Sequence, residues 1–292
     1  MYHALEDAIR EAESRGATLA TVALDIEARD QGRPVAEIRD ALRRALGVMR
    51  GAVERGLVGD LRSNSGLVGG DAAKLRTAAA GPLADTVFRE VLMRALAVQE
   101  VNAAMGVIVA APTAGGAGVL PGVLLGLAAR HAVDDERLVD ALATAGLIGA
   151  VVAQRASLSG AEGGCQAETG AAAGMAAGAA TELLGGTPAQ VGHAVALAQQ
   201  GTLGLVCDPL GGLVELPCVF RNATGAAIAL AAVEMALAGI TFAIPADEVI
   251  DTMGEIGRDM DVRYRETAGG GLAQTPTGRR LAKERLTQIK RG

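Results

Sequence analysis

Two stretches frame the fold of this chain: SLSGAEGGCQAETG at residues 157–170 and LGLVCDPLGGLVELPCVFRN at residues 203–222. Between them runs Gln166–Leu184, which is rich in alanine and glycine and apolar on most faces. Such a segment is typical of a buried central helix. Glycine or proline stands close to each cysteine of the two stretches, which favours turns over helix interiors. The pattern predicts one site assembled from distant loops. The chain has three cysteines, and all of them lie in these stretches: Cys165, Cys207 and Cys218.

The composition favours closely packed helices. Of 292 residues, 50% are hydrophobic but only 2% are aromatic, and 40 are glycine. Small side chains let helix axes approach closely. No segment shows the sustained alternation of a strand, and neither a linker rich in proline or serine nor an internal repeat is visible. The sequence therefore predicts one compact all-α domain over residues 1–292, with residues 1–60 as an N-terminal helical scaffold and the cysteines on loops between helices.

Charge and cysteine count exclude several classes of protein. A formal net charge of -6 argues against a nucleic-acid partner. Three cysteines are an odd number, which does not suit a closed disulfide framework and favours a reduced, cytoplasmic compartment. The charged N-terminus lacks the apolar core of a signal peptide. The apolar runs Val101–Ala129 and Ala223–Ile244 are interrupted by proline and glycine or by Glu234, so we expect buried core and no membrane span.

Helix signals recur along the chain. After Pro34, apolar residues from Ile38 to Leu57 recur at steps of three and four, which predicts an amphipathic helix. Met1–Gly16 predicts a short helix, followed by a loose segment. Thr187 with Gln190 resembles a capping box that opens a helix. The further helices that we expect are Gly81–Gly106, Val123–Arg130, Asp134–Ala156, Gln166–Leu184, Thr187–Gln200, Asn222–Gly239, Pro245–Met260 and Arg279–Arg291.

Two glycine-rich loops offer donors for an anion. In SNSGLVGGDAAKL, residues 63–75, glycine amides, serine hydroxyls and a lysine are able to hold a carboxylate. The alternative is a plain loop in which Asp71 caps a helix. In APTAGGAGVLPG, residues 111–122, amides precede a helix, although a tight helix–helix connection fits equally. This loop lacks the lysine of a nucleotide-binding loop. The candidate substrate-binding residues are Ser63, Ser65, Gly66, Gly69, Gly70, Asp71, Thr113, Ala114, Gly115 and Gly116.

The cysteines suggest an iron–sulfur centre. Cys207 follows Cys165 by 42 residues and precedes Cys218 by 11, which is neither a zinc-knuckle nor a ferredoxin spacing. Three thiolates from separated loops are suited to bind three irons of a 4Fe-4S cluster and leave the fourth iron open as a Lewis acid. The alternative is three buried free cysteines that act as small hydrophobic side chains.

Taken together with RYRETAGGGLA at residues 263–273, the quoted motifs resemble the alpha chain of iron–sulfur-dependent L-serine dehydratase, also called L-serine ammonia-lyase. The resemblance runs from about Asp60 to Gly278, with the motifs in the family's order. It implies an all-helical catalytic domain, a 4Fe-4S cluster on the three cysteines, no pyridoxal phosphate, and a separate beta chain with an α/β domain. Ala114 and Ala117 depart from relatives that carry Asn and Cys there.

The resemblance further implies deamination of L-serine to pyruvate and ammonia, with the substrate hydroxyl at the open iron. The base would be Lys74, Ser159 or a group of the beta chain. Glu162 and Glu168 are expected to support Cys165, and His131 and His193 to be structural. Two other roles remain open: a related iron–sulfur lyase acting on cysteine or threonine, and a non-catalytic helical subunit.

The same resemblance guides the remaining site and partner expectations. We expect Asp208, Arg221 and Asn222 to order the cysteine loops or the substrate, and the triple glycine at residues 269–271 to close over the site. Expected partners are L-serine, the beta chain and a second alpha chain.

Overall fold

The computed structural model describes residues 2–79 and 86–289, with side chains through residue 284. In these ranges the chain forms helices and one isolated β-bridge, and no strand. The prediction of an all-α protein is confirmed. The α-helices are α1 Leu5–Arg15, α2 Leu19–Gln31, α3 Val35–Leu57, α4 Asp71–Thr77, α5 Val87–Ala103, α6 Val119–Ala128, α7 Asp135–Arg155, α8 Gly160–Gly163, α9 Ala171–Leu183, α10 Pro188–Gln200, α11 Cys218–Leu237, α12 Ala246–Asp259 and α13 Pro276–Ile289. Shorter helical turns are η1 Gln166–Gly170, which is a π-helix, and the 3-10 turns η2 Leu210–Gly212, η3 Val262–Tyr264 and η4 Gly271–Gln274.

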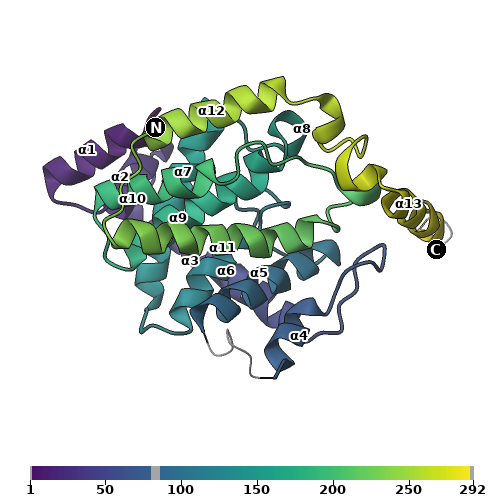
Figure 1. Ribbon diagram of the computed structural model, residues 1–292. Coiled ribbons are helices and arrows are strands. Elements are labelled where there is room, and N and C mark those ends of the chain that lie inside the picture. The colour runs from purple at the N-terminus through teal and green to yellow at the C-terminus, as the bar shows by residue number, and fades with distance from the viewer. Residues whose placement is uncertain (1, 80–85, 290–292) are drawn as a thin grey trace.

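Helix α9 lies at the centre of the fold, between α7, α10 and α11 (Figure 1). Twelve of its thirteen residues are buried. Its glycines allow the close approach of both neighbours: a Cβ at Gly178 would lie 2.4 Å from Cδ1 of Ile148 on α7, and one at Gly174 would lie 2.8 Å from Cγ of Gln199 on α10. The predicted central helix is therefore confirmed, and small side chains are what let its neighbours surround it.

A second close contact joins α5 and α6. Gly118, Gly122 and Gly126 recur at every fourth residue, and a Cβ on any of them would lie within 2.4 to 2.8 Å of an atom of Ala95 or Val91. The apolar helix begins at Val119, four residues earlier than the sequence predicted. The reason is that a proline in the first turn of a helix loses no intrahelical hydrogen bond, so Pro121 belongs to the helix and does not break it.

Helix α2 corrects another expectation, because residues 19–31 form a helix where the sequence predicted a loose segment. The hydroxyl of Thr18 accepts the amide hydrogen of Thr21, which caps the first turn, and the left-handed Gly32 ends the helix. Six of its residues are buried against neighbouring helices. Tertiary packing thus stabilises a segment whose amphipathic pattern is weak.

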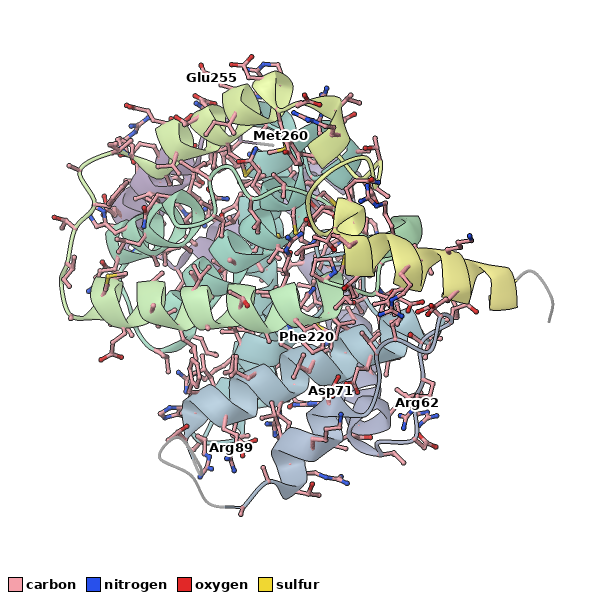
Figure 2. The ribbon with its side chains drawn as sticks, turned by 45° about the vertical axis from the view of Figure 1, so that its right-hand side comes forward. Arg62, Asp71, Arg89, Phe220, Glu255 and Met260 are labelled. Carbon is pink, nitrogen blue, oxygen red and sulfur yellow. The ribbon has the colours of Figure 1, made fainter. Side chains whose placement is uncertain are left out.

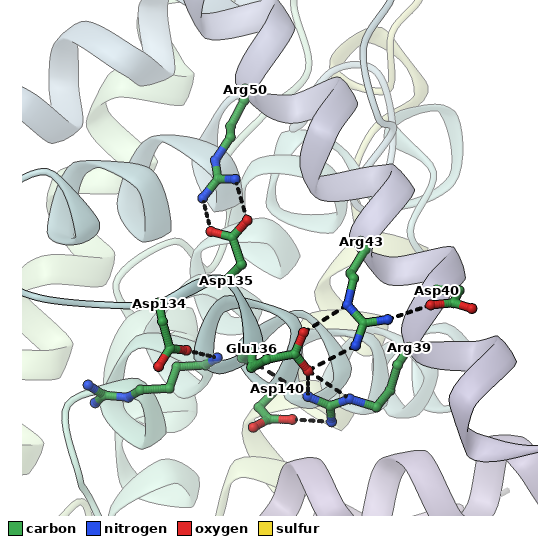
Figure 3. Close-up of polar contacts among 9 residues, drawn as sticks. Arg39, Asp40, Arg43, Arg50, Asp134, Asp135, Glu136 and Asp140 are labelled. Carbon is green, nitrogen blue, oxygen red and sulfur yellow. Dashed lines mark hydrogen bonds and ion pairs between the residues drawn. The ribbon is translucent and has the colours of Figure 1, made fainter.

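Ion pairs attach α3 to the start of α7 (Figure 3). Arg39 and Arg43 both bond the carboxylate of Glu136, at 2.7 and 2.8 Å, and Arg50 bonds Asp135 at 2.5 Å. The two arginines lower the pKa of Glu136 to about 2, chiefly through hydrogen bonds, first from Arg43 and then from Arg39. The predicted amphipathic helix of this region is confirmed as α3, whose apolar face packs on α5 and α7.

The remaining helix predictions hold within a few residues. The capping box at Thr187 and Gln190 is present in both directions. Residues 81–85 of the predicted helix Gly81–Gly106, residues 290–291 of the predicted helix Arg279–Arg291 and Met1 of the predicted first helix lie outside the described part of the chain. Within that part, one helix, α11, has the length and apolar composition to cross a membrane. It contacts α5, α9 and α10, and nine of its side chains are buried.

Candidate functional site

Three cysteines from separate segments meet beside the central helix. Cys165 has helical backbone at the entry to η1, Cys207 lies in the loop after α10, and Cys218 is the first residue of α11. All three are buried and none forms a disulfide. Only Cys207 therefore lies on an irregular loop, although the sequence predicted loops for all three. Cys218 begins a helix because Pro217, directly before it, needs no amide hydrogen at a helix start.

The three thiols lie close enough to influence one another's ionisation. Burial raises the pKa of Cys207, and the charges of Cys165, Glu168 and Cys218 raise it further. Burial, followed by Cys165 and Glu168, raises the pKa of Cys218 to about 12. Arg221 acts in the opposite direction on Cys165 and Cys218, although burial keeps the pKa of Cys165 raised. Holding these thiols as thiolates therefore requires positive charge within the group.

Glu168 projects from the π-helical turn into the same space. Its Oε1 accepts the hydroxyl hydrogen of Thr113 at 2.7 Å, and Sγ of Cys207 lies 4.0 Å from its Oε2. Glycines make room for it: a Cβ at Gly115 or at Gly160 would lie 2.7 Å from Oε2. Burial raises the pKa of Glu168. The sequence treated Glu168 as support for Cys165, and the structure also connects it to the Thr113 loop.

Side-chain amides fix the orientation of the peptides in the loop of residues 113–118. The carbonyl of Gly115 accepts hydrogen bonds from Gln99 Nε2 at 2.8 Å and from Asn222 Nδ2 at 2.6 Å, and Gln99 Nε2 also bonds the carbonyl of Ala114. In a trans peptide the amide hydrogen points away from the carbonyl oxygen. The amides of Gly115 and Gly116 therefore point away from Gln99 and Asn222. Both glycines are buried, and no acceptor for their amides occurs among the described residues.

The other glycine loop is bound by the chain's own carboxylates. Amides of Gly70, Asp71 and Ala72 donate to Glu100 at 3.0, 2.6 and 3.2 Å, and the amide of Ser65 donates to Glu215 at 3.0 Å.

The remaining groups of this loop are also engaged locally. The hydroxyl of Ser65 bonds Glu215 as well, and Ser63 exchanges hydrogen bonds with Val68. Gly66 and Gly69 have positive φ, which suits glycine and shapes the turn. Gly70 precedes the first turn of α4, and Asp71 forms no side-chain cap there. The donors with these partners are therefore not free for a substrate carboxylate in this conformation, whereas the amide of Gly69 has no acceptor among the described residues.

The two candidate bases lie in different surroundings. Lys74 is 76% exposed and pairs with Asp71 at 2.6 Å. Asp71, at the start of α4, is labelled in Figure 2. Ser159 is half-buried and directly precedes Gly160, which is in contact with Glu168 and Cys207. The sequence grouped Lys74 and Ser159, whereas the structure brings only Ser159 near the cysteines.

The segment after α12 lies against Cys207. The amide of Cys207 donates to the carbonyl of Tyr264 at 2.8 Å, and the amide of Glu266 donates to the carbonyl of Cys207 at 2.9 Å. Glu266 has φ of 63° and Ala268 of 54°, a left-handed backbone that non-glycine residues rarely adopt. At the end of α12, Met260 (Figure 2) packs where a Cβ on Gly164 would lie 2.6 Å from its sulfur. The segment that leads to the triple glycine thus lies against Cys207, and Gly271 lies against Asp208, while closure of residues 269–271 over the site stays a prediction.

The three thiols are the side chains of this site that could hold a metal centre. In residues 2–79 and 86–284, no group of three or more His, Cys, Asp or Glu side chains is tight enough for one ion. In a cluster each thiolate binds a different iron, so the sulfurs stand farther apart than around one zinc. Three buried thiols, with Arg221 to offset their charge, fit such a group.

Sequence reasoning missed several buried polar residues that build this site. Gln99, Glu100 and Glu215 are at most 4% exposed and bond the two glycine loops. Gln166 bonds the amide of Gly204 and the carbonyl of Met253. For Gln99 and Glu100 the available signal was a polar side chain inside the apolar helix α5, because such groups are buried only where they have hydrogen-bond partners.

Comparison with known proteins identifies the family of this chain. The family described as "Serine dehydratase alpha chain" matches residues 9–273. The "Probable L-serine dehydratase, alpha chain" of Bacillus subtilis (strain 168) is 53% identical over 241 residues, which cover 82% of this chain and 80% of that protein. The "L-serine dehydratase, alpha chain" of Peptoniphilus asaccharolyticus is 38% identical over 278 residues, 94% of each chain. "L-serine dehydratase TdcG" of Escherichia coli (strain K12) is 48% identical over 183 residues, 62% of this chain and 40% of that protein. The chain therefore belongs to the serine dehydratase alpha chain family.

Proposed function

We propose that this chain is the catalytic alpha chain of an L-serine dehydratase, a lyase that converts L-serine to pyruvate and ammonia. The observation that carries the proposal is the set of three buried, free thiols beside Glu168 and the loop of Gly115 and Gly116, whose amides have no acceptor among the described residues. The names of the relatives, which specify L-serine dehydratase, supply the substrate and the reaction class.

The proposed cofactor is a 4Fe-4S cluster on Cys165, Cys207 and Cys218, without pyridoxal phosphate. Bound there, it would supply a Lewis acid that makes the substrate hydroxyl a better leaving group. A reduced, cytoplasmic setting belongs to the same proposal, because thiols must stay free to bind iron.

The chain's own residues bind and orient the substrate. Amides of Gly115 and Gly116 donate to the carboxylate of L-serine, which offsets its charge and makes the Cα proton easier to remove. Glu168 fixes the hydroxyl of Thr113 at the edge of this loop. Proton removal and loss of water give aminoacrylate, which tautomerises to an imine and hydrolyses to pyruvate and ammonia. The proposed base is Ser159 or a group of the beta chain.

The test is an anaerobic assay of pyruvate formation after reconstitution with iron and sulfide, with and without the beta chain. We expect pyruvate from L-serine to require iron and each cysteine, so that Cys165→Ala, Cys207→Ala and Cys218→Ala are all inactive. Activity without iron would refute the proposal. Faster turnover of L-threonine or L-cysteine than of L-serine would assign a different substrate. If pyruvate formation depends on the beta chain, part of the site lies on that partner. Measurement of the molecular mass of the alpha chain in solution would test its self-association.

The base is tested by a matched pair of variants. Ser159→Ala is expected to lower kcat at least about tenfold if its hydroxyl acts on the substrate. Lys74→Ala is the control, because Lys74 is exposed and pairs with Asp71 away from the thiols. A full loss of activity in Lys74→Ala with Ser159→Ala unaffected would reverse the assignment.

A further inference from the structure

Arg221 connects the helix that carries Cys218 to the loop that carries Cys207. It lies three residues after Cys218 on α11, and its Nη1 donates to the carbonyl of Val206 at 2.8 Å. Its Nη2 lies 2.8 Å from Oδ1 of Asp208. Arg221 thus contacts the residue before Cys207 and the residue after it. One guanidinium holds both flanks of a cysteine in the loop, because its donors are arranged in a rigid planar fork.

Asp208 extends this connection to a third segment. Its Oδ2 accepts the amide hydrogen of Leu272 at 2.6 Å. A Cβ on Gly271 would lie 2.1 Å from the same oxygen, so only glycine fits there. Oδ1 of Asp208 lies within ion-pair distance of Arg221 but accepts no hydrogen bond of good geometry. Charge attraction therefore makes this contact. Asp208 therefore joins the cysteine loop to the segment of residues 264–272.

The ion pair of Arg221 and Asp208 is largely removed from water, so its strength depends on the protein groups around it. The side chains of Arg221 and Asp208 are 17% and 3% exposed. Two charges removed from water are retained only where fixed partners compensate them. The charge of Arg221 also faces the thiols of Cys165 and Cys218. Breaking the pair would leave a buried charge beside the cysteines and release three segments at once.

We propose that Arg221 and Asp208 are positioning residues that fix the separation of Cys207 and Cys218 in the protein before iron is bound. The identity of the bound cluster rests on the proposed function, whereas the preset geometry is a property of the iron-free chain. Arg221 sets the position of the Cys207 loop, and Asp208 couples that position to closure of the glycine-rich segment.

The test uses the full chain without iron and measures amide hydrogen exchange by segment. In Arg221→Gln and Asp208→Asn we expect exchange at residues 204–209 and 264–273 to become at least about tenfold faster, while α7 and α9 keep their protection. Arg221→Lys keeps the charge but not the planar fork of donors, so its exchange rates should fall between those of the parent and those of Arg221→Gln. The matched control is Arg155→Gln, which removes a partly buried arginine paired with Asp251 at 2.5 Å outside the cysteine site.

A second measurement uses the chain reconstituted with iron. Loss of a positive charge near the cluster should shift its reduction potential to a more negative value in Arg221→Gln, whereas Arg221→Lys and Arg155→Gln should leave it close to that of the parent. Unchanged exchange in both Arg221→Gln and Asp208→Asn, or equally faster exchange across the whole chain, would overturn the proposal. If the parent chain takes up no iron, the proposed function fails while the exchange experiment still decides the preset geometry.

Discussion

Glu168 shows how much of the site depends on single atoms. Its carboxylate lies between the hydroxyl of Thr113 and the sulfur of Cys207, with Gly115 and Gly160 against its sides. A methyl group on either glycine would occupy the space that the carboxylate fills. Glycine is needed at both positions because the carboxylate of Glu168 packs against it. Backbone freedom is not the reason, since neither residue has a positive φ.

The first prediction concerns Gly115→Ala. Its Cβ would lie 2.7 Å from both carboxylate oxygens of Glu168, so either Glu168 or the 113–118 loop must move. Displacement of about 1 Å in a substrate-binding loop costs on the order of 100-fold in rate, so we expect kcat/KM for L-serine to fall at least tenfold. Pyruvate formation by the reconstituted enzyme measures this effect. The control is Gly146→Ala, where a Cβ would meet no atom within 4 Å.

The second prediction concerns Glu182 on α9, a half-buried residue whose carboxyl is partly removed from water. Burial raises its pKa, and hydrogen bonds from Thr144 and from the amide of Ala20 oppose this only partly. A carboxyl whose folded-state pKa is raised binds more protons in the folded state, so its contribution to stability is greatest below the unfolded pKa and is lost as pH rises. Glu182→Gln should therefore gain stability relative to the parent as pH rises above about 4.5 toward neutrality.

Thermal unfolding of both proteins at a series of pH values tests this expectation. Other titrating groups cancel in the difference between the two melting temperatures. A difference that stays constant with pH would contradict the raised pKa of Glu182.

At the scale of elements, the contact of α5 with α6 depends on three glycines in a row along one face. The sequence predicted a glycine-rich loop through Gly118 and Gly122 and an apolar helix only from Val123, because Pro121 and Gly122 are breakers in an isolated helix. In the folded protein Ala95 and Val91 fill the space beside these glycines. Packing against α5 thus overrides the local preference of the segment.

The third prediction tests this packing with Gly126→Ala. Its Cβ would lie 2.5 Å from Cγ2 of Val91, so the two helices must separate. Overpacking of this kind costs about 1–3 kcal/mol of unfolding free energy. Gly146→Ala on α7 has open space at its Cβ and should instead gain about 0.5–1 kcal/mol, because glycine is unfavourable inside a helix. Denaturant unfolding of both variants measures the contrast, and destabilisation of both would contradict it.

Across the whole molecule, ion pairs connect the N-terminal helices to the helices that build the site. Glu136 at the start of α7 receives Arg39 and Arg43 from α3, and α7 in turn packs on α9. The side chains of this network are largely exposed. Its ion pairs therefore orient α3 against α7 and add little to the free energy of unfolding.

The fourth prediction is that Glu136→Gln lowers the melting temperature slightly at low salt, and that the difference fades as salt rises from about 0.05 to about 0.5 M. The physical reason is that salt screens exposed charges. Asp40→Asn serves as a control, because Asp40 pairs with Arg43 within α3 and does not connect two helices. A salt-independent loss in Glu136→Gln would indicate a packing effect instead.

The sequence by itself determined the helical class, the central position of the alanine-rich helix and the three cysteines of the site. These follow from local pattern: small apolar residues without strand alternation, and rare thiols beside helix breakers. Only the tertiary structure decided which donors remain available. Glu100 and Glu215 accept amide hydrogens of the first glycine loop, whereas Gln99 and Asn222 bond carbonyls of the second, so that its glycine amides point away from these two side chains. Partners 16 to 150 residues away in the chain make these choices, so no local pattern reveals them.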